Sequence, residues 1–338
     1  MNAYKRPWRF LELVTRARRS VVLLALLALA TAAAAQGNKP PRVAYVMSGT
    51  MEGSRLLVAA MRAGLADEGL VDGRNVVLDV RYLDGRTERY AEVFADIVRD
   101  SVDVLAAAGP VGIRAARDAS AGRIPVGAYF CGTDVKQMVE SFARPGGNVT
   151  GVSCFSAELA VKRVELLKDA IPGLRRIGYL YDPRNPGKDK ELSEVRDAAT
   201  KLGMSVVAAT VSAPDGFRVA IASLRRERAE ALIISEDPFT YAHRAQIVAL
   251  SAEHQMPDIS SFREFVVAGG VLSYGASTVD GQRHLGRYFA KMIRGAKPSE
   301  LPIWHPMRFE LVVNRKAARA LGLTIPNMVL MRADDVIE

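Results

Sequence analysis

The sequence predicts an α/β fold of two doubly wound parallel-sheet lobes joined by a three-segment hinge. Apolar strand-like runs alternate with helical repeats from residue 42 onward, which is typical of parallel sheets. The plan also begins twice: "RVAYVMSGT" at Arg42 and "RIGYLYDPRNP" at Arg176 each place a tyrosine fourth in an apolar strand that ends in a polar turn. One open sheet rarely holds so many strands, so we expect two.

Strands of the first lobe are predicted from nearly continuous apolar runs, which indicate burial on both faces. They cover residues 43–47, 76–82, 102–108 and 125–130, with helices over 56–65, 90–98 and 113–119 between them. The 56–65 helix has an apolar stripe at helical spacing, and Gly69 is expected to end it. Pro145, Gly146 and Gly147 break the pattern, and a new strand starts at Asn148.

The second lobe repeats the alternation. Its predicted strands are 177–181, 206–211 and 231–235, and its helices are 159–170, 192–202, 217–226 and 241–253. The remaining elements, at 270–274, 282–294, 307–313 and 315–321, are too few for a third domain and are assigned to both lobes. We therefore expect chain crossings near 150–153, 273–277 and 302–306, with lobe 1 formed by 42–150 plus 275–302 and lobe 2 by 151–274 plus 303–338.

The first 35 residues have the pattern of a secretory signal peptide. A basic leader precedes ten apolar residues, Val21 to Ala30, and small residues follow up to Ala35. The apolar run is short for a membrane-spanning helix, although an uncleaved anchor is the alternative. Arg18-Arg19 weakly resembles a twin-arginine signal, so the export route stays open. The protein is expected to be periplasmic once the leader is cleaved.

Much of the net charge of +9 lies in this leader, where six basic residues face one glutamate. The remainder of the chain has the balance of an ordinary soluble protein, so the charge does not indicate a nucleic-acid partner. Export would place Cys131 and Cys154 in an oxidising compartment. Two cysteines alone leave both a disulfide and a pair of part-buried thiols open.

Known catalytic and metal motifs are absent from the sequence. It contains no G-x-G-x-x-G, no P-loop, no G-x-S-x-G and no H-E-x-x-H, and its four histidines are isolated. Glu236 and Asp237 are neighbours in the chain, so they point opposite ways when extended. We therefore expect no catalytic residues, no metal and no cofactor.

Polar residues instead follow the predicted strands, at the edge where open α/β sheets bind ligands. They are Ser48, Gly49, Thr50, Gly109, Cys131, Gly132, Thr133, Asp134, Asp182, Arg184, Asn185, Asp237 and Phe239. Helix starts attract a carboxylate, aspartates neutralise an ammonium, and Tyr129, Phe130, Phe239 and Tyr274 offer aromatic surface. This mixture predicts an amino-acid-like zwitterion as ligand. The alternative for each single residue is a helix cap, as for Asp182-Pro183 and Asp237-Pro238 with proline at N1, and for Tyr274 it is packing.

Several longer motifs point to one family. They are "RPGGNVTGVS" (144–153), "DPRNP" (182–186), "EDPF" (236–239), "REFVVAGGVLSYGAS" (263–277), "GAKPSELPI" (295–303) and "FELVVNRKAARALGLTIP" (309–326). With these motifs the chain resembles the ABC-transporter substrate-binding proteins of the tryptophan/tyrosine-binding-like group, which have the type I periplasmic binding fold. The resemblance runs from about residue 42 to the C-terminus.

The resemblance implies lobes that close on a solute. It adds Met51 to the cleft residues of the first loop and places the hinge at Tyr274 and Gly275. The chain departs from the family pattern at "AAAGPVG" (106–112), at the cysteine of "YFCGTD" (129–134) and at "DPRNP". These segments belong to the predicted pocket, so the solute is not carried over from the family.

The predicted function is that of a monomeric, exported solute-binding component of an ABC importer. It would bind a small polar or amino-acid-like solute by hinge closure and deliver it to a membrane permease unchanged. A sensory partner of a membrane receptor is the alternative, and an exported enzyme on the same scaffold comes next. A DNA regulator would need a helix-turn-helix where the leader stands.

Overall fold

The computed structural model describes residues 39–131, 135–154 and 156–338. The predicted signal peptide, residues 1–35, lies outside this part, as do Gly132, Thr133 and Asp134. The chain divides into two compact units, 1–40 and 41–338, and only the second is described below.

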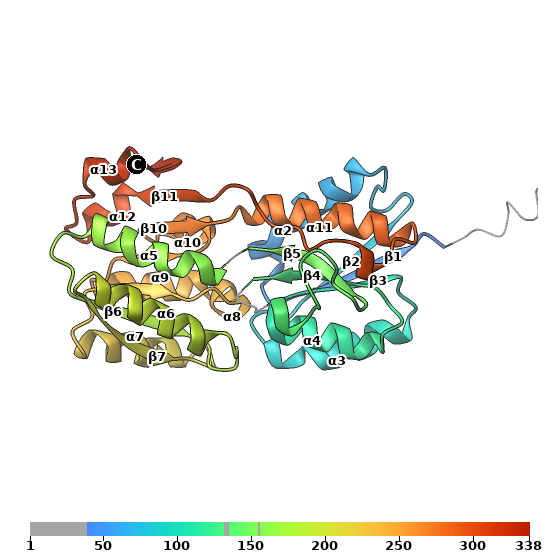
Figure 1. Ribbon diagram of the computed structural model, residues 1–338, viewed down its shortest axis with the longest axis horizontal. Helices are drawn as coiled ribbons and strands as arrows, with labels where there is room; N and C mark the ends of the chain where they lie inside the picture. Colours follow the sequence, from blue (N-terminus) through green and yellow to red (C-terminus); the bar gives the residue numbers. More distant parts are fainter. Residues whose placement is uncertain (1–38, 132–134, 155) are drawn as a thin grey trace, which may run out of the picture. The chain divides into compact units, whose positions relative to one another are not determined.

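The first sheet has five parallel strands in the order β2-β1-β3-β4-β5 (Figure 1). Its strands are β1 (Arg42–Met47), β2 (Val77–Tyr82), β3 (Val104–Ala108), β4 (Val126–Phe130) and β5 (Val149–Ser153). The chain starts in the middle and builds outward in both directions, as a doubly wound sheet does. This confirms the fold class predicted for the first lobe.

Helices cover both faces of this sheet (Figure 1). They are α2 (Met51–Asp67) and α11 (Thr278–Ile293) on one face, and α3 (Tyr90–Arg99) and α4 (Gly109–Ser120) on the other, with short 3-10 turns at Thr87–Arg89, Val135–Gln137 and Pro298–Glu300. Along β1, Val43 and Tyr45 belong to one apolar cluster and Ala44 and Val46 to another. The run is continuously apolar because alternate side chains enter two cores.

Helix α11 comes from the C-terminal third of the chain but packs against α2 (Figure 1). The two backbones approach closely at Gly64 and Gly286, where an added Cβ would overlap backbone atoms of the partner helix. Arg283 and Arg287 of α11 pair with Asp67 at the end of α2, each at 2.8 Å. This packing assigns α11 to the first lobe.

The second sheet has seven strands in the order β12-β11-β10-β9-β8-β6-β7. They are β6 (Arg176–Tyr181), β7 (Ser205–Thr210), β8 (Ala231–Ile234), β9 (Asp258–Ser260), β10 (Leu272–Gly275), β11 (Glu310–Asn314) and β12 (Asp335–Ile337). All neighbours pair in parallel except β10 and β11. Sequence analysis missed β9 and β12, because three residues are too few to show a period.

Helices of the second lobe are α5 (Ser156–Ala170), α6 (Lys188–Lys201), α7 (Gly216–Arg226), α8 (Pro238–Ala242), α9 (Arg244–Glu253), α10 (Arg263–Val267), α12 (Arg315–Ala320) and α13 (Asn327–Leu330). The single helix predicted over 241–253 is wrong in one respect. It is divided at His243 into α8 and α9, and α8 begins earlier, directly after Asp237. The short helices α10 and α13 were not predicted.

The chain passes between the two sheets three times. The crossings lie between β5 and α5, between β10 and α11, and between Trp304 and β11. Trp304 still belongs to the first lobe, since its N–H donates to Gly151 O at 2.9 Å. Three parallel connections permit bending about the hinge and restrict other motions.

One buried acid of the second lobe makes folding depend on pH. Asp258 is 2% exposed, and its Oδ1 accepts the Val271 N–H at 2.7 Å. Burial raises the pKa of Asp258 to about 7, and the Val271 hydrogen bond opposes that rise. The folded chain therefore keeps a proton that the unfolded chain releases at lower pH, so this stabilisation is lost as pH rises through about 7.

We expect Asp258→Asn to remove that pH dependence. Between pH 5 and pH 8 the free energy of unfolding of the wild type should fall by about 3 kcal/mol relative to the variant. Urea unfolding of both proteins at several pH values measures the difference. Parallel stability curves would contradict the assignment.

Candidate functional site

A cavity lies where the carboxyl ends of the two sheets face each other. The first lobe supplies Tyr45, Met47, Ser48, Gly49, Ser54, Leu57, Ala108, Tyr129, Cys131, Thr278 and Gln282, and the second supplies Asp237, Pro238, Tyr241 and Phe262. Ligands of open α/β sheets bind at this edge. The lining is mostly apolar, with a small number of polar groups, as ligand pockets usually are.

The lobes touch around this cavity. Ser48 Oγ donates to Pro238 O at 3.0 Å, and Arg244 Nη2 donates to Gly53 O at 3.1 Å. Gly109 lies against the Pro238 ring so closely that a Cβ at that position would overlap it. These contacts join residues far apart in the chain and define a closed arrangement of the two lobes.

The closed cavity is small. Its volume of about 50 Å³ accommodates a few water molecules. Pockets for small organic ligands usually measure roughly 300–1,000 Å³. The two lobes must therefore separate to admit a solute of amino-acid size. When they close on the solute, the cavity between them must stay larger than it is in this closed arrangement.

Asp237 is both a helix cap and a cavity residue. Its Oδ1 accepts the Phe239 N–H at 2.7 Å at the start of α8, as the Asp-Pro pattern predicts. Its Oδ2 accepts from Asn185 Nδ2 at 2.8 Å. Burial raises the pKa of Asp237 to about 6, the Asn185 hydrogen bond lowers it, and the charge of Asp182 raises it. A cation bound beside Asp237 would stabilise its ionised form.

Asp182 does not cap a helix, which corrects the expectation from Asp182-Pro183. Helix α6 begins at Lys188, and the Asp182 carboxylate accepts the Arg184 N–H at 2.9 Å and that residue's guanidinium at 2.7–3.1 Å. The guanidinium carbon of Arg184 lies 5.0 Å from the ring centroid of Phe239. Asp182, Asn185 and Gly109 line a second, smaller pocket that shares Asp237 and Pro238 with the first.

The aromatic residues expected at the site separate into two groups. Tyr129 lines the cavity. Phe239 is buried against Phe217, with ring centroids 5.2 Å apart, and Phe130 lies in the core beneath the opposite face of the first sheet. Tyr274 packs on Phe309 at 6.4 Å. Packing therefore accounts for these three rings in the closed structure.

Only some of the remaining predicted residues are known to line the cavity. Ser48, Gly49 and Cys131 line it. Thr50 is the N-cap of α2, where its side chain accepts the Gly53 N–H at 3.1 Å, and Met51 is 69% exposed. Gly275 ends β10, where a Cβ would overlap Ser261 O. The predicted Gly132, Thr133 and Asp134 lie outside the described residues.

Several cavity residues escaped the sequence analysis. They include Tyr45, Tyr241, Phe262 and Gln282. Gln282 had a detectable signal, since it occupies the buried stripe of α11 with Thr278, Leu285 and Phe289 at helical spacing. A glutamine in such a stripe is unusual for a core position. The predicted helix began at Gln282 itself, so the stripe was not visible.

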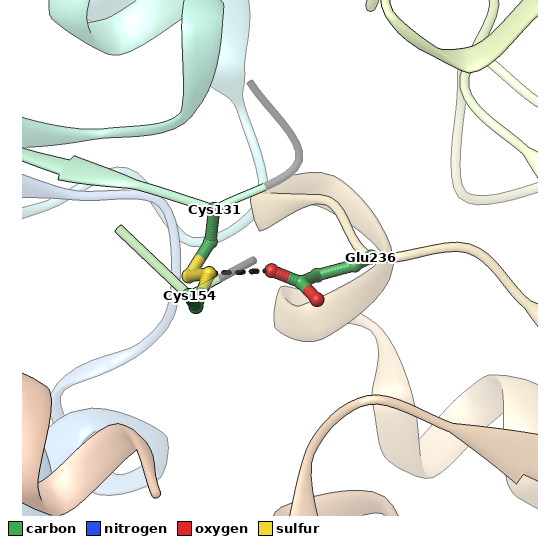
Figure 2. Close-up of side chains that lie close together, drawn as sticks. All are labelled: Cys131, Cys154 and Glu236. Atoms are coloured by element: carbon green, nitrogen blue, oxygen red, sulfur yellow. Dashed lines mark hydrogen bonds between the residues drawn. A yellow bond between two sulfur atoms is a disulfide. The ribbon is translucent and has the colours of Figure 1, made fainter. Parts of the chain in front are cut away.

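Cys131 and Cys154 form a disulfide that joins the ends of β4 and β5 (Figure 2). Their Cα atoms are 5.5 Å apart, within the usual range for a disulfide. Cys154 Sγ lies 2.7 Å from Glu236 Oε1 of the second lobe (Figure 2). A disulfide sulfur has no proton, so the proton in this contact belongs to Glu236, whose pKa burial raises to about 7.

The donor atoms of Cys131, Cys154 and Glu236 lie within 4.8 Å of one another, which is close enough for a metal. The chemistry does not fit one. The two sulfurs are bonded to each other and provide no thiolate. Arg163 Nη2 lies 3.6 Å from Glu236 Oε2 and already supplies a positive charge.

Comparisons with known proteins place the chain in a family. The family model described as ABC transporter substrate binding protein matches residues 47–337. The chain belongs to the ABC transporter substrate-binding protein family. The resemblance inferred from its motifs is thereby confirmed.

This substrate-binding protein is 23% identical over 276 residues to a protein of Clostridioides difficile named "Tyrosine-binding protein", covering 80% of this chain and 79% of the relative. It also resembles a crystal structure from Streptococcus pneumoniae titled as a complex with L-Trp, at a TM-score of 0.79 and 24% identity, covering 88% and 100% of the two chains. A Vibrio cholerae structure gives 0.80, with the same identity and coverage. These likenesses support the fold.

Among the described residues of this substrate-binding protein, no helix combines the length and apolar character needed to cross a membrane.

We expect Gly109→Ala to prevent full closure. Gly109 and Gly122 both have a φ of 71°. A Cβ at Gly109 would overlap Pro238 of the other lobe, and a Cβ at Gly122 would have no atom within 4 Å. Gly122→Ala is thus a matched control for backbone strain. Small-angle scattering should show a larger radius of gyration for Gly109→Ala alone. Equal radii for both variants would contradict a closed wild type.

We also expect the disulfide to stabilise the protein. It closes a loop with a sequence separation of 23, so replacing both cysteines by serine should lower the free energy of unfolding by about 3 kcal/mol. Thiol titration of the unreduced, unfolded wild type should find no free cysteine. Two titratable thiols in that sample would contradict the bond.

Proposed function

We propose that this chain is the exported, monomeric solute-binding component of an ABC importer and that it binds an aromatic amino acid such as tyrosine or tryptophan. The cavity between the lobes carries this proposal. Tyr45, Tyr129, Tyr241 and Phe262 supply aromatic wall from both lobes, and Asp237 supplies a buried carboxylate at its edge. The names of the two relatives with a stated amino acid agree with this chemistry.

The two ends of an amino acid find complementary groups here. The N-terminus of the 17-residue helix α2 follows Ser48 and Gly49 directly, and Ser54 in its first turn also lines the cavity. Backbone N–H groups and hydroxyls of this kind favour a carboxylate. Asp237 suits the ammonium, because no Lys or Arg is among the described residues that line the cavity.

Delivery without chemical change is supported by the same lining. Among the described lining residues, no histidine stands beside a hydroxyl, and Ser48 Oγ is engaged with Pro238 O. A nucleophile–base pair needs such a neighbour. The secretory pattern of residues 1–35 and the family membership support export and a membrane permease as partner. We propose the two lobes as the units that dock on it. The boundaries expected from the sequence move by a few residues, because β5 (Val149–Ser153) and Trp304 belong to the first lobe and β10 (Leu272–Gly275) to the second.

Binding of an amino acid should weaken as the pH falls through about 6, where Asp237 becomes protonated. Between pH 7.5 and pH 5 we expect about a tenfold loss of affinity in calorimetric titrations with L-Tyr or L-Trp. Asp237→Asn keeps the helix cap but should bind weakly at both pH values, without the pH dependence.

Asp258→Asn provides the matched control, since it alters a similarly buried acid away from the cavity and should preserve the wild-type pH dependence of binding. A thermal-shift screen of amino acids and small acids tests the proposal more broadly. It would be overturned if no solute stabilised the protein and one of them were chemically converted.

A further inference from the structure

Helix α11 carries the amide side chain of Gln282 into the cavity at a core position. Gln282 is 2% exposed and shares the buried stripe of the helix with Leu285 and Phe289. Its Nε2 donates to Tyr45 OH at 3.2 Å. Burial raises the pKa of Tyr45 to about 12, so its hydroxyl stays neutral and accepts this hydrogen bond throughout the physiological range.

The other end of the amide lacks a partner. Gln282 Oε1 is buried and accepts no hydrogen bond from any described residue. With Nε2 engaged by Tyr45, Oε1 is available to accept a hydrogen bond from a bound molecule. A buried carbonyl oxygen without a donor destabilises the closed protein, and a ligand that supplies the donor removes this penalty.

The second lobe contributes another polar group to the cavity, and this group also has no partner among the described residues. Tyr241 lines the same cavity, is 9% exposed and has no hydrogen-bond partner for its hydroxyl among the described residues. Met47, Leu57 and Phe262 are large apolar side chains of the wall. The cavity thus combines apolar side chains with two polar groups that no described residue satisfies.

We infer that Gln282 is the specificity-determining residue of the site and that it selects a ligand whose aromatic ring carries an N–H or O–H donor. Tyrosine and tryptophan have such a donor, and phenylalanine lacks it. The inference rests on the proposed function and narrows it to this ligand class. A site built around a buried acceptor discriminates strongly against the analogue without the donor, because the acceptor is then left unpaired.

The test compares the wild type with Gln282→Met, which keeps the length of the side chain and removes the acceptor. Gln246→Met is the matched control: Gln246 also lies on a helix, but it is exposed and donates to Pro214 O away from the cavity. Calorimetric titrations of all three proteins with L-Tyr, L-Trp and L-Phe measure the affinities. Thermal unfolding without ligand checks that each variant is folded.

We expect the wild type to bind L-Tyr or L-Trp about tenfold to a hundredfold more tightly than L-Phe. Gln282→Met should lose that preference, with L-Phe bound at least as well as before. Gln246→Met should behave as the wild type does.

Two results would overturn the inference and leave the proposed function intact: equal wild-type affinity for the three amino acids, or an equal loss for all three in Gln282→Met. If none of the three binds to the wild type, both the inference and the assignment of an aromatic amino acid fail. Gln282→Glu gives a further check, because it restores an acceptor and should recover part of the preference.

Discussion

Contact between the carboxyl ends of two separate sheets is the constraint on which the rest of this structure depends. Pro238 of the second lobe packs its ring against the Gly109 backbone and accepts a hydrogen bond from Ser48 Oγ on its carbonyl oxygen, so one residue contacts the first lobe twice. Such an approach requires a residue without a Cβ, in a turn with positive φ, at position 109. The cavity stays open because the contacts between the two lobes lie around its edge.

Behind the cavity, buried charge connects the hinge to the second lobe. Arg163 follows the first crossing, pairs with Glu236 at 3.6 Å and donates from Nε to Tyr274 O at 3.0 Å, just before the second crossing. Burial raises the pKa of Glu236 more strongly than Arg163 lowers it. Arg163 carries a buried charge, and removing one of its acceptors is costly, so these contacts hold the crossing segments in register. Tyr274 therefore contacts Arg163 through its backbone carbonyl, just before the second crossing.

Much of the fold was accessible from the sequence because its signals are local. Continuous apolar runs located most strands within two or three residues, and the repeated strand-turn plan revealed two lobes. The site was accessible in part. Ser48, Gly49, Cys131 and Asp237 follow strands, and strand ends of parallel sheets share one edge. Three-residue strands and one-turn helices left no periodic signal and were missed.

What the sequence determined by itself is the set of groups at each strand end and the duplication of the lobes, since these follow from spacing along the chain. Tertiary structure decided which of them meet. It brought Gln282 to Tyr45 and Ser48 to Pro238. Helix packing and chain crossings bring together residues that are hundreds of positions apart. Such contacts leave no periodic pattern in the local sequence, so the sequence alone does not predict them.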